Sequence, residues 1–143
     1  MFAALCDDDK YITEEIKKLL LEYAKDNRIT IDIDEFESGE ELLNSEKNYD
    51  IIVLDYQLGS TNGLTVAKEL RKRNVLSSII FLTSYPNFMI DAFEVNTFRF
   101  LLKPIDKSKF FKAIDDYIKI VDANYPITII QNKELKKIIL KMF

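Results

Sequence analysis

The stretch Ile51-Ile52-Val53-Leu54-Asp55 decides the fold, because four consecutive apolar residues are followed directly by an acid. A strand that is apolar at every position must be buried on both faces. Central strands of parallel sheets meet this condition, since helices cover the sheet on both sides. We therefore expect these residues to form a central parallel strand that ends at Asp55.

Working outward, shorter apolar runs alternate with stretches that carry apolar residues at helical spacing. Strands are expected at 2–6, 29–33, 51–54, 78–82 and 98–102. Helices are expected at about 12–23, 38–43, 64–71, 88–94 and 106–121. Ser38, with Glu41 three residues later, is typical of a capping box at a helix start. The strict alternation of five strands and five helices predicts an α/β fold with a parallel sheet.

The composition excludes several kinds of active site. The chain has 143 residues, with no histidine and 3 glycines. Without histidine there is no Ser-His-Asp or Cys-His pair, no histidine-ligated zinc and no imidazole base. The three glycines are too few and too scattered for the phosphate-binding loops of Rossmann or P-loop proteins. Chemistry in this chain must rest on carboxylates, hydroxyls, lysines and backbone groups.

The bulk numbers are those of an ordinary globular domain, with 48% hydrophobic and 31% charged residues. The single cysteine, Cys6, excludes an internal disulfide and fits a reducing compartment. No apolar run approaches the ~20 residues of a membrane span. Acidic residues from Asp7 onward do not fit a signal peptide. We therefore expect a cytoplasmic protein without membrane contact.

The charge and the residue pattern change near the C-terminus. The last 19 residues carry 4 basic residues and 1 acidic residue, whereas the rest of the chain has an acidic excess. Pro126 is expected to break the preceding helix, and the β-branched run Ile127–Ile130 is expected to form a strand. These observations predict one domain over residues 1–122. Residues 123–143 would be a linker and the possible start of a truncated second domain, or alternatively a basic extension that packs on the first.

Polar groups follow four of the five expected strands. They are Asp7-Asp8-Asp9, Asp55, Thr83-Ser84 and Lys103. In an open parallel α/β sheet, ligands bind outside the carboxyl ends of the strands, so these groups should meet at one edge. Converging carboxylates repel one another unless a cation joins them, and oxygen ligands alone favour a hard cation such as Mg²⁺. Together with a lysine and a hydroxyl, they suit placing a phosphoryl group on an aspartate.

Each group has a simpler explanation by itself. An acidic turn after a strand is usually a helix start, and Thr83-Ser84 alone is most often a helix N-cap. Lys103 followed by Pro104 is most often a loop with a solvated lysine. The combination favours a functional site, because four separate strand ends supply groups that one mechanism needs.

On these residues the sequence resembles the receiver domain of two-component response regulators, over residues 1 to about 122. The matching positions are Asp7-Asp8, Asp55, Thr83 and Lys103-Pro104, with Gly63 eight residues past Asp55. The resemblance implies a flavodoxin-like doubly wound (βα)5 fold with strand order 2-1-3-4-5. It also implies that Asp55 accepts a phosphoryl group from a partner sensor histidine kinase.

The resemblance assigns roles to further residues. Asp8, Asp55 and the backbone carbonyl of Gln57 would hold Mg²⁺, with Asp7 acting through water. Lys103 would contact the phosphoryl oxygen, and its peptide bond to Pro104 would be cis.

The same resemblance implies a switch around the acceptor. Thr83 would move to hydrogen-bond the phosphate, and Phe100 would swing inward behind it. Gln57 and Tyr85 occupy positions that govern water access to the acyl phosphate, and a bulky Tyr85 suggests slow dephosphorylation. The domain would assist its own phosphotransfer and dephosphorylation without being an enzyme in the usual sense.

The sequence departs from the family pattern at three places. Gly59 stands where the family usually has proline, which leaves the loop less restrained. The third acid, Asp9, leaves the metal pair open by one residue, although Asp7 and Asp8 directly follow the apolar strand. Phe100 replaces the commoner tyrosine, so the aromatic switch would rest on packing alone.

Residues 92–96 and the run from Phe100 to Pro104 resemble receivers attached to LytTR-type DNA-binding domains. The tail at 127–136 resembles the start of such a domain, so DNA binding would belong to an output domain missing from this chain. We also expect phosphorylation to promote homodimerisation through the fourth helix, fifth strand and fifth helix. The apolar residues behind this expectation are Phe88, Phe93, Phe98 and Phe110.

Two other functions remain open. A haloacid-dehalogenase-type enzyme also uses an aspartyl nucleophile, but it needs an acid two residues later, where this chain has Gln57. A pseudo-receiver would be an interaction domain that is never phosphorylated. The complete acidic set, with Thr83 and Lys103, favours the receiver over both.

Overall fold

The strand β3 (Ile51–Asp55) is buried at every position and lies in the middle of a five-stranded parallel sheet. The computed structural model describes residues 1–130, with side chains described as far as residue 122. Ile52 and Leu54 belong to the core on one face of the sheet, while Ile51 and Val53 belong to the core on the other. The prediction of a strand buried on both sides is therefore confirmed.

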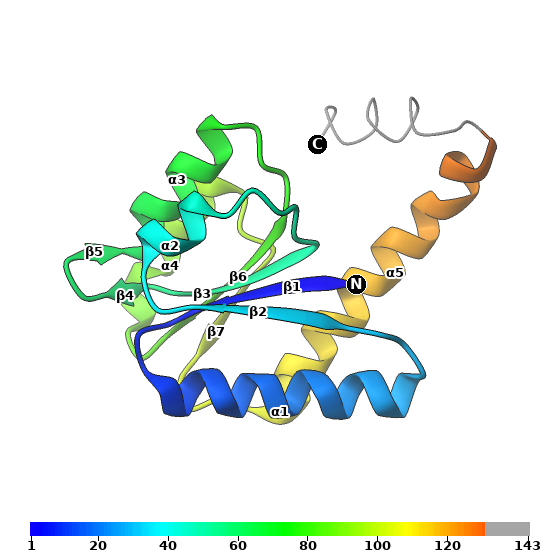
Figure 1. Ribbon diagram of the computed structural model, residues 1–143, viewed down its shortest axis with the longest axis horizontal. Helices are drawn as coiled ribbons and strands as arrows, with labels where there is room; N and C mark the ends of the chain where they lie inside the picture. The colour runs from blue at the N-terminus through cyan, green and yellow to red at the C-terminus, as the bar shows by residue number, and fades with distance from the viewer. Residues whose placement is uncertain (131–143) are drawn as a thin grey trace.

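The sheet has the predicted topology, with the order β2-β1-β3-β6-β7. Its other strands are β1 (Phe2–Cys6), β2 (Asp32–Phe36), β6 (Ser78–Thr83) and β7 (Arg99–Leu102). The numbers differ from the expected 2-1-3-4-5 only because a short antiparallel hairpin, β4 (Gln57–Leu58) and β5 (Thr61–Asn62), follows β3. This hairpin, which was not predicted from the sequence, projects beside α2 and α3 (Figure 1).

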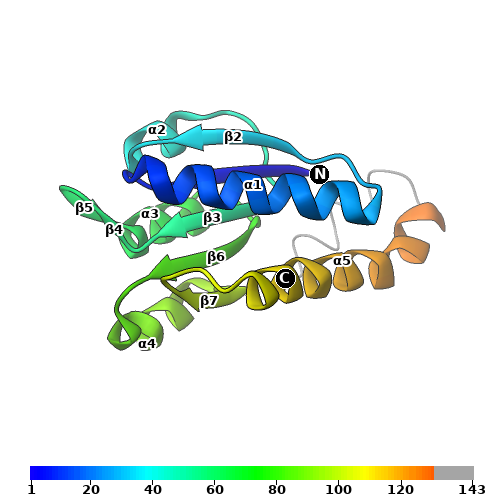
Figure 2. The ribbon, with the colours of Figure 1, turned by 90° about the horizontal axis from the view of Figure 1, so that it is seen from below.

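Helices cover both faces of the sheet (Figures 1 and 2). One layer contains α1 (Lys10–Asn27) and α5 (Lys107–Ile130), which supply apolar side chains to the core over Leu5 and Ile80. The other layer consists of α2 (Gly39–Asn44), α3 (Gly63–Lys72) and α4 (Met89–Ala92). The capping box at α2 is present in part: Ser38 caps the helix by accepting from the Glu41 N–H, while the Glu41 carboxylate accepts from the Glu37 N–H.

The second strand lies three residues later than predicted. It pairs with β1 from Asp32 opposite Phe2 to Phe36 opposite Cys6. Residues 29–31 instead connect the end of α1 to β2. The helix ends there because Arg28 adopts a left-handed conformation, and the Ile29 N–H donates to the carbonyl of Ala24. The alternating run at 29–33 thus covers the approach to β2 and only its first two residues, Asp32 and Ile33.

The fourth helix is not one helix. The 3-10 turn η1 (Pro86–Phe88), the four-residue α4 and the 3-10 turn η2 (Phe93–Val95) follow one another. Residues 86–95 therefore form three short helical pieces, each with few internal hydrogen bonds. Short helical pieces of this kind depend on side-chain contacts with the rest of the domain.

The end of α5 was predicted wrongly. The helix continues through Pro126 to Ile130, whereas the sequence analysis expected an end near Val121 and a strand at Ile127–Ile130. A strand needs a neighbour for its backbone groups, but a helix satisfies them internally. Pro126 removes one helical hydrogen bond without ending the helix. Residues 131–143 lie outside the described part of the chain, so the expected domain boundary stays a prediction.

None of the helices in residues 1–130 combines the length and apolar character that a membrane span requires.

Candidate functional site

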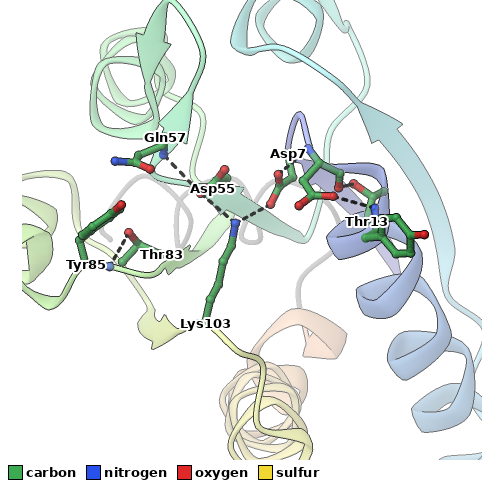
Figure 3. A network of polar contacts seen from close by, with 9 residues as sticks. Asp7, Thr13, Asp55, Gln57, Thr83, Tyr85 and Lys103 are labelled. Atoms are coloured by element: carbon green, nitrogen blue, oxygen red, sulfur yellow. Dashed lines mark hydrogen bonds and ion pairs between the residues drawn. The ribbon is translucent and has the colours of Figure 1, made fainter.

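Three strand ends bring charged side chains together at the carboxyl edge of the sheet (Figure 3). Asp7 follows β1, Asp55 ends β3 and Lys103 follows β7. The two carboxylates are buried, with 4% and 6% of their residues exposed. They are separated by 48 residues in sequence, and the parallel pairing of β1 with β3 places them side by side.

Lys103 is the cation between these carboxylates. Its Nζ lies 3.0 Å from Asp7 Oδ2 and 3.3 Å from Asp55 Oδ1. Burial acts to lower the pKa of Lys103, but the hydrogen bond to Asp7 and the nearby carboxylates outweigh it and raise the pKa. The ammonium group therefore stays charged and is held against both acids.

The surroundings of Asp55 disfavour the charged form of its carboxyl group. Burial, followed by the charge of Asp7, raises the pKa of Asp55 to about 6. Lys103 and the Gln57 N–H, which donates to Asp55 Oδ1 at 3.3 Å, act in the opposite direction. A further positive group near Asp55 would therefore be stabilised.

Three carboxylates lie close enough to share a cation. Oxygen atoms of Asp7, Asp8 and Asp55 can be chosen within 4.8 Å of one another. Asp8 is exposed and faces the opening. Asp9 is used differently, since it is the N-cap of α1 and accepts from the Tyr11 N–H at 2.9 Å. An all-oxygen set with one exposed member fits Mg²⁺, which keeps several of its own waters.

The carboxylates line an open cavity of about 620 Å³. Several of its lining residues were not assigned to the site from the sequence: hairpin β4–β5 and segment 86–95 supply most of them, and Tyr56 directly follows Asp55. These residues are Tyr56, Gly59, Thr61, Asn62 and Phe88. Asn62 had a detectable signal, because asparagine is a preferred N-cap residue, and it caps α3 by accepting from the Thr65 N–H.

The predicted switch residues lie on β6 and β7 beside the acids. Thr83 is buried, and its hydroxyl oxygen accepts from the Tyr85 N–H at 3.1 Å (Figure 3). Phe100 is half-buried, with its ring centroid 6.5 Å from that of Phe81. Tyr85 is about half exposed, and the bond between Lys103 and Pro104 is cis.

Two glycines shape the loop after Asp55. Gly59 has a φ of +62°, a left-handed conformation that proline cannot adopt, which accounts for its presence where the family usually has proline. A methyl group on Gly63 would overlap the backbone carbonyl of Asp55 and lie 3.0 Å from the Phe81 ring. Gly63 also donates its N–H to the Tyr56 carbonyl at 2.6 Å. Strand β3 and α3 can approach this closely only because residue 63 has no side chain.

Comparisons with known proteins agree with this geometry. A sequence profile described as the response regulator receiver domain matches residues 3–115. The sensory transduction protein LytT of Bacillus cereus is 34% identical over 120 residues, covering 83% of this chain and 48% of LytT. LytR of Staphylococcus epidermidis is 32% identical over 117 residues, covering 80% of this chain and 45% of LytR. The chain thus spans about half the length of these curated relatives.

Solved structures share the fold. The response regulatory domain of mrkE from Klebsiella pneumoniae has a TM-score of 0.76 at 21% identity, covering 86% of this chain and 99% of that one. The response regulator protein TrrA from Thermotoga maritima, in complex with Mg(2+)-BeF, has a TM-score of 0.70 at 28% identity. The match covers 81% of this chain and 97% of TrrA.

Proposed function

Because this chain belongs to the response regulator receiver domain family, with relatives of the LytT and LytR type, we propose that it accepts a phosphoryl group on Asp55. The donor would be a phosphohistidine on a partner sensor histidine kinase. The observation that carries the proposal is the position of Asp55. Its carboxylate lies 3.3 Å from the Lys103 ammonium and beside Asp7, at the floor of an open cavity.

The proposed transfer is a simple displacement at phosphorus. A carboxylate oxygen of Asp55 forms the new P–O bond, while the P–N bond of the phosphohistidine breaks and its electron pair returns to the imidazole. Lys103 is placed to hold a phosphoryl oxygen next to Asp55. In that position it neutralises the charge that the arriving group adds to the pocket.

Magnesium fits the same pocket. Asp7, Asp8, Asp55 and the backbone carbonyl of Gln57 would hold the ion, which when bound supplies charge neutralisation at the phosphoryl oxygens. The complex of TrrA with Mg(2+)-BeF supports this assignment by similarity. Asp7 is engaged by Lys103 at 3.0 Å, which agrees with a contact through water for this residue.

Thr83 and Phe100 are the proposed switch. The Thr83 hydroxyl lies at the end of β6, next to β7. If the hydroxyl turned toward a phosphoryl group, its hydrogen bond with the Tyr85 N–H would pull the loop that follows β6 along with it. Phe100 then fills the space behind it through packing alone. We further propose that Gln57 and Tyr85, both exposed at the mouth of the loop, tune the access of water to the acyl phosphate.

The acceptor is tested by labelling. We expect the wild-type protein to gain one phosphoryl group from acetyl phosphate in Mg²⁺, measured by intact mass spectrometry. Asp55→Asn should gain none, whereas Asp9→Asn, which alters the cap of α1, should still be labelled. Labelling of Asp55→Asn would place the acceptor elsewhere. No labelling of the wild type by this donor or a kinase would favour the pseudo-receiver instead.

Homodimerisation through the α4–β7–α5 face is part of the proposal, with one correction to the residues. Phe110 is fully buried in the core and cannot contribute to an interface. Phe93 and Ile90 are 76% and 78% exposed, and Tyr85, Met89 and Leu102 are also exposed. In sedimentation velocity, beryllofluoride with Mg²⁺ should convert monomer to dimer. Phe93→Ser should bind beryllofluoride but remain monomeric; a dimer would exclude this face.

We assign transcriptional control and DNA contact to an output domain outside these 143 residues. The relatives named LytT and LytR are about twice as long as the part this chain matches. The described domain has an acidic excess, which does not suit a nucleic-acid surface.

A further inference from the structure

Tyr56 joins the acceptor strand to the segment that contains α4. It directly follows Asp55, and its side chain is buried. Its ring stacks on Phe88 of η1, with the centroids 4.0 Å apart and the planes inclined by 9°. Its hydroxyl donates toward Asp91 of α4 at 3.5 Å. One side chain therefore contacts both η1 and α4 from the position next to the proposed acceptor.

The beginning of segment 86–95 has few other anchors among the described residues. No side chain caps η1, and none of its residues is buried. In α4, Ala92 is buried but Met89 and Ile90 are exposed. The stack of Phe88 on Tyr56 is therefore a principal contact that fixes this end of the segment.

The other end of the segment is held firmly. Arg71 of α3 donates to the carbonyls of Val95 at 2.8 Å and Asn96 at 3.2 Å. The Thr97 hydroxyl donates to the Ala92 carbonyl at 2.5 Å. A segment fixed at its end and resting on one ring at its beginning can move about the fixed end.

The same aromatic residues face the acceptor. Tyr56 and Phe88 line the cavity that contains Asp55. The ring of Tyr85 meets Phe88 edge to face, with the centroids 6.0 Å apart, and its N–H is bonded to Thr83. A displacement of Thr83 therefore pulls on residues directly connected to the stack.

We propose that Tyr56 is a positioning residue, whose stack on Phe88 couples phosphorylation of Asp55 to the position of residues 86–92. The inference rests on the proposed function, because it uses Asp55 as the acceptor. Coupling between two sites is reciprocal, so the position of the segment also affects how tightly the pocket holds a phosphoryl group. Losing the stack leaves the carboxylates and Lys103 in place but disconnects the segment from them.

The test measures hydrogen exchange in residues 87–96 with and without beryllofluoride and Mg²⁺, and beryllofluoride affinity by calorimetry; Tyr85 is left out because its N–H is bonded to Thr83 directly. In the wild type, beryllofluoride should change exchange in this segment. In Tyr56→Leu, binding should persist with affinity changed roughly 2- to 10-fold, the factor expected from one aromatic pair, and exchange should no longer respond. A variant whose segment responds like the wild type would overturn the inference. So would a wild type that binds without responding.

Two further sets of variants separate the contacts. Phe88→Leu removes the same stack by changing its other ring, which belongs to a half-buried residue. Its effects on affinity and exchange should match those of Tyr56→Leu, and the double variant should show little further change. Phe88→Leu also keeps the test decisive if Tyr56→Leu does not fold by circular dichroism.

Tyr56→Phe keeps the stack and loses the hydroxyl, so its segment should still respond. Tyr49→Phe is the matched control, because Tyr49 is another buried tyrosine that donates to an aspartate, Asp34, at 2.7 Å. Failure of the wild type to bind beryllofluoride would overturn the proposed function itself. Binding with an unaltered response in both stack variants would overturn only the role of Tyr56.

Discussion

At the scale of single residues, Asp55 makes the domain less stable where it is ionised. Its pKa is about 6 in the folded protein, against 3.8 as the ordinary value, because burial and Asp7 disfavour its charge. The folded state therefore binds the proton more tightly than the unfolded chain. The free energy of unfolding should fall as the pH rises from about 4 to 6, and the full penalty should be present at pH 7.

Asp55→Asn removes this penalty. We expect the variant, without Mg²⁺, to be more stable than the wild type at pH 7 by on the order of 1–3 kcal/mol, with the difference fading toward pH 4. Urea denaturation at several pH values measures it. Asp116→Asn should have the opposite sign at pH 7, because hydrogen bonds from Arg99 and Lys112 lower the pKa of Asp116. A pH-independent gain in Asp55→Asn would contradict the electrostatic cause.

Gly63 and Gly59 should respond differently to alanine. In Gly63→Ala the new methyl group meets backbone atoms of Asp55, which cannot rotate away, so we expect a loss of about 2–3 kcal/mol in the free energy of unfolding. In Gly59→Ala the methyl group makes only an ordinary contact, 3.9 Å from Asp8 Oδ2, and the positive φ alone is unfavourable, so about 1 kcal/mol is expected. Urea denaturation of both variants checks the order; equal losses would contradict it.

At the scale of elements, α3 holds the end of segment 86–95 through one guanidinium. Arg71 donates to three carbonyls on two segments, those of Val75, Val95 and Asn96. Burial lowers the pKa of Arg71, which forms no ion pair within the described residues. The backbone oxygens of a helix end therefore take the place of a carboxylate partner.

Arg71→Lys tests this arrangement. A single ammonium cannot reach three carbonyls that a planar guanidinium reaches with separate N–H groups, so we expect a loss of about 1–3 kcal/mol in urea denaturation. Faster hydrogen exchange in η2 should accompany it. Arg73→Lys is the control, since the half-exposed Arg73 pairs with Glu69 and donates to only one backbone carbonyl, that of Leu43 at 2.8 Å, and it should change stability by less than about 1 kcal/mol.

At the scale of the whole molecule, the sequence predicted the sheet better than the helices on its second face. Apolar runs such as Ile51–Leu54 and their polar ends predicted the parallel sheet and the acidic pocket, while the strand order followed from the resemblance to receiver domains. The pieces of segment 86–95 have no such periodicity, and their position depends on contacts with Tyr56 and Arg71 from distant parts of the chain. Residue spacing along a sequence cannot predict contacts between such distant parts of the chain.

The course of α5 shows the same limit. The β-branched run at Ile127–Ile130 favours a strand locally, yet the helix continues through it. Tyr23 of α1 and Asp115 of α5, joined by a hydrogen bond, show that the two helices of this layer support each other earlier along their length. Local preference was outweighed by the continuity of the helix.

The contact between Asp7 and Lys103 joins residues 96 positions apart, which has a consequence for the protein during its synthesis. Lys103 follows Asp55 by 48 residues. At ~5–20 residues per second, the ribosome synthesises Asp55 roughly 2–10 seconds before it adds Lys103, the lysine that completes the pocket. A chain still being translated therefore carries Asp55, the proposed acceptor, without its cation, and we expect it to take up no phosphoryl group until β7 has joined the sheet.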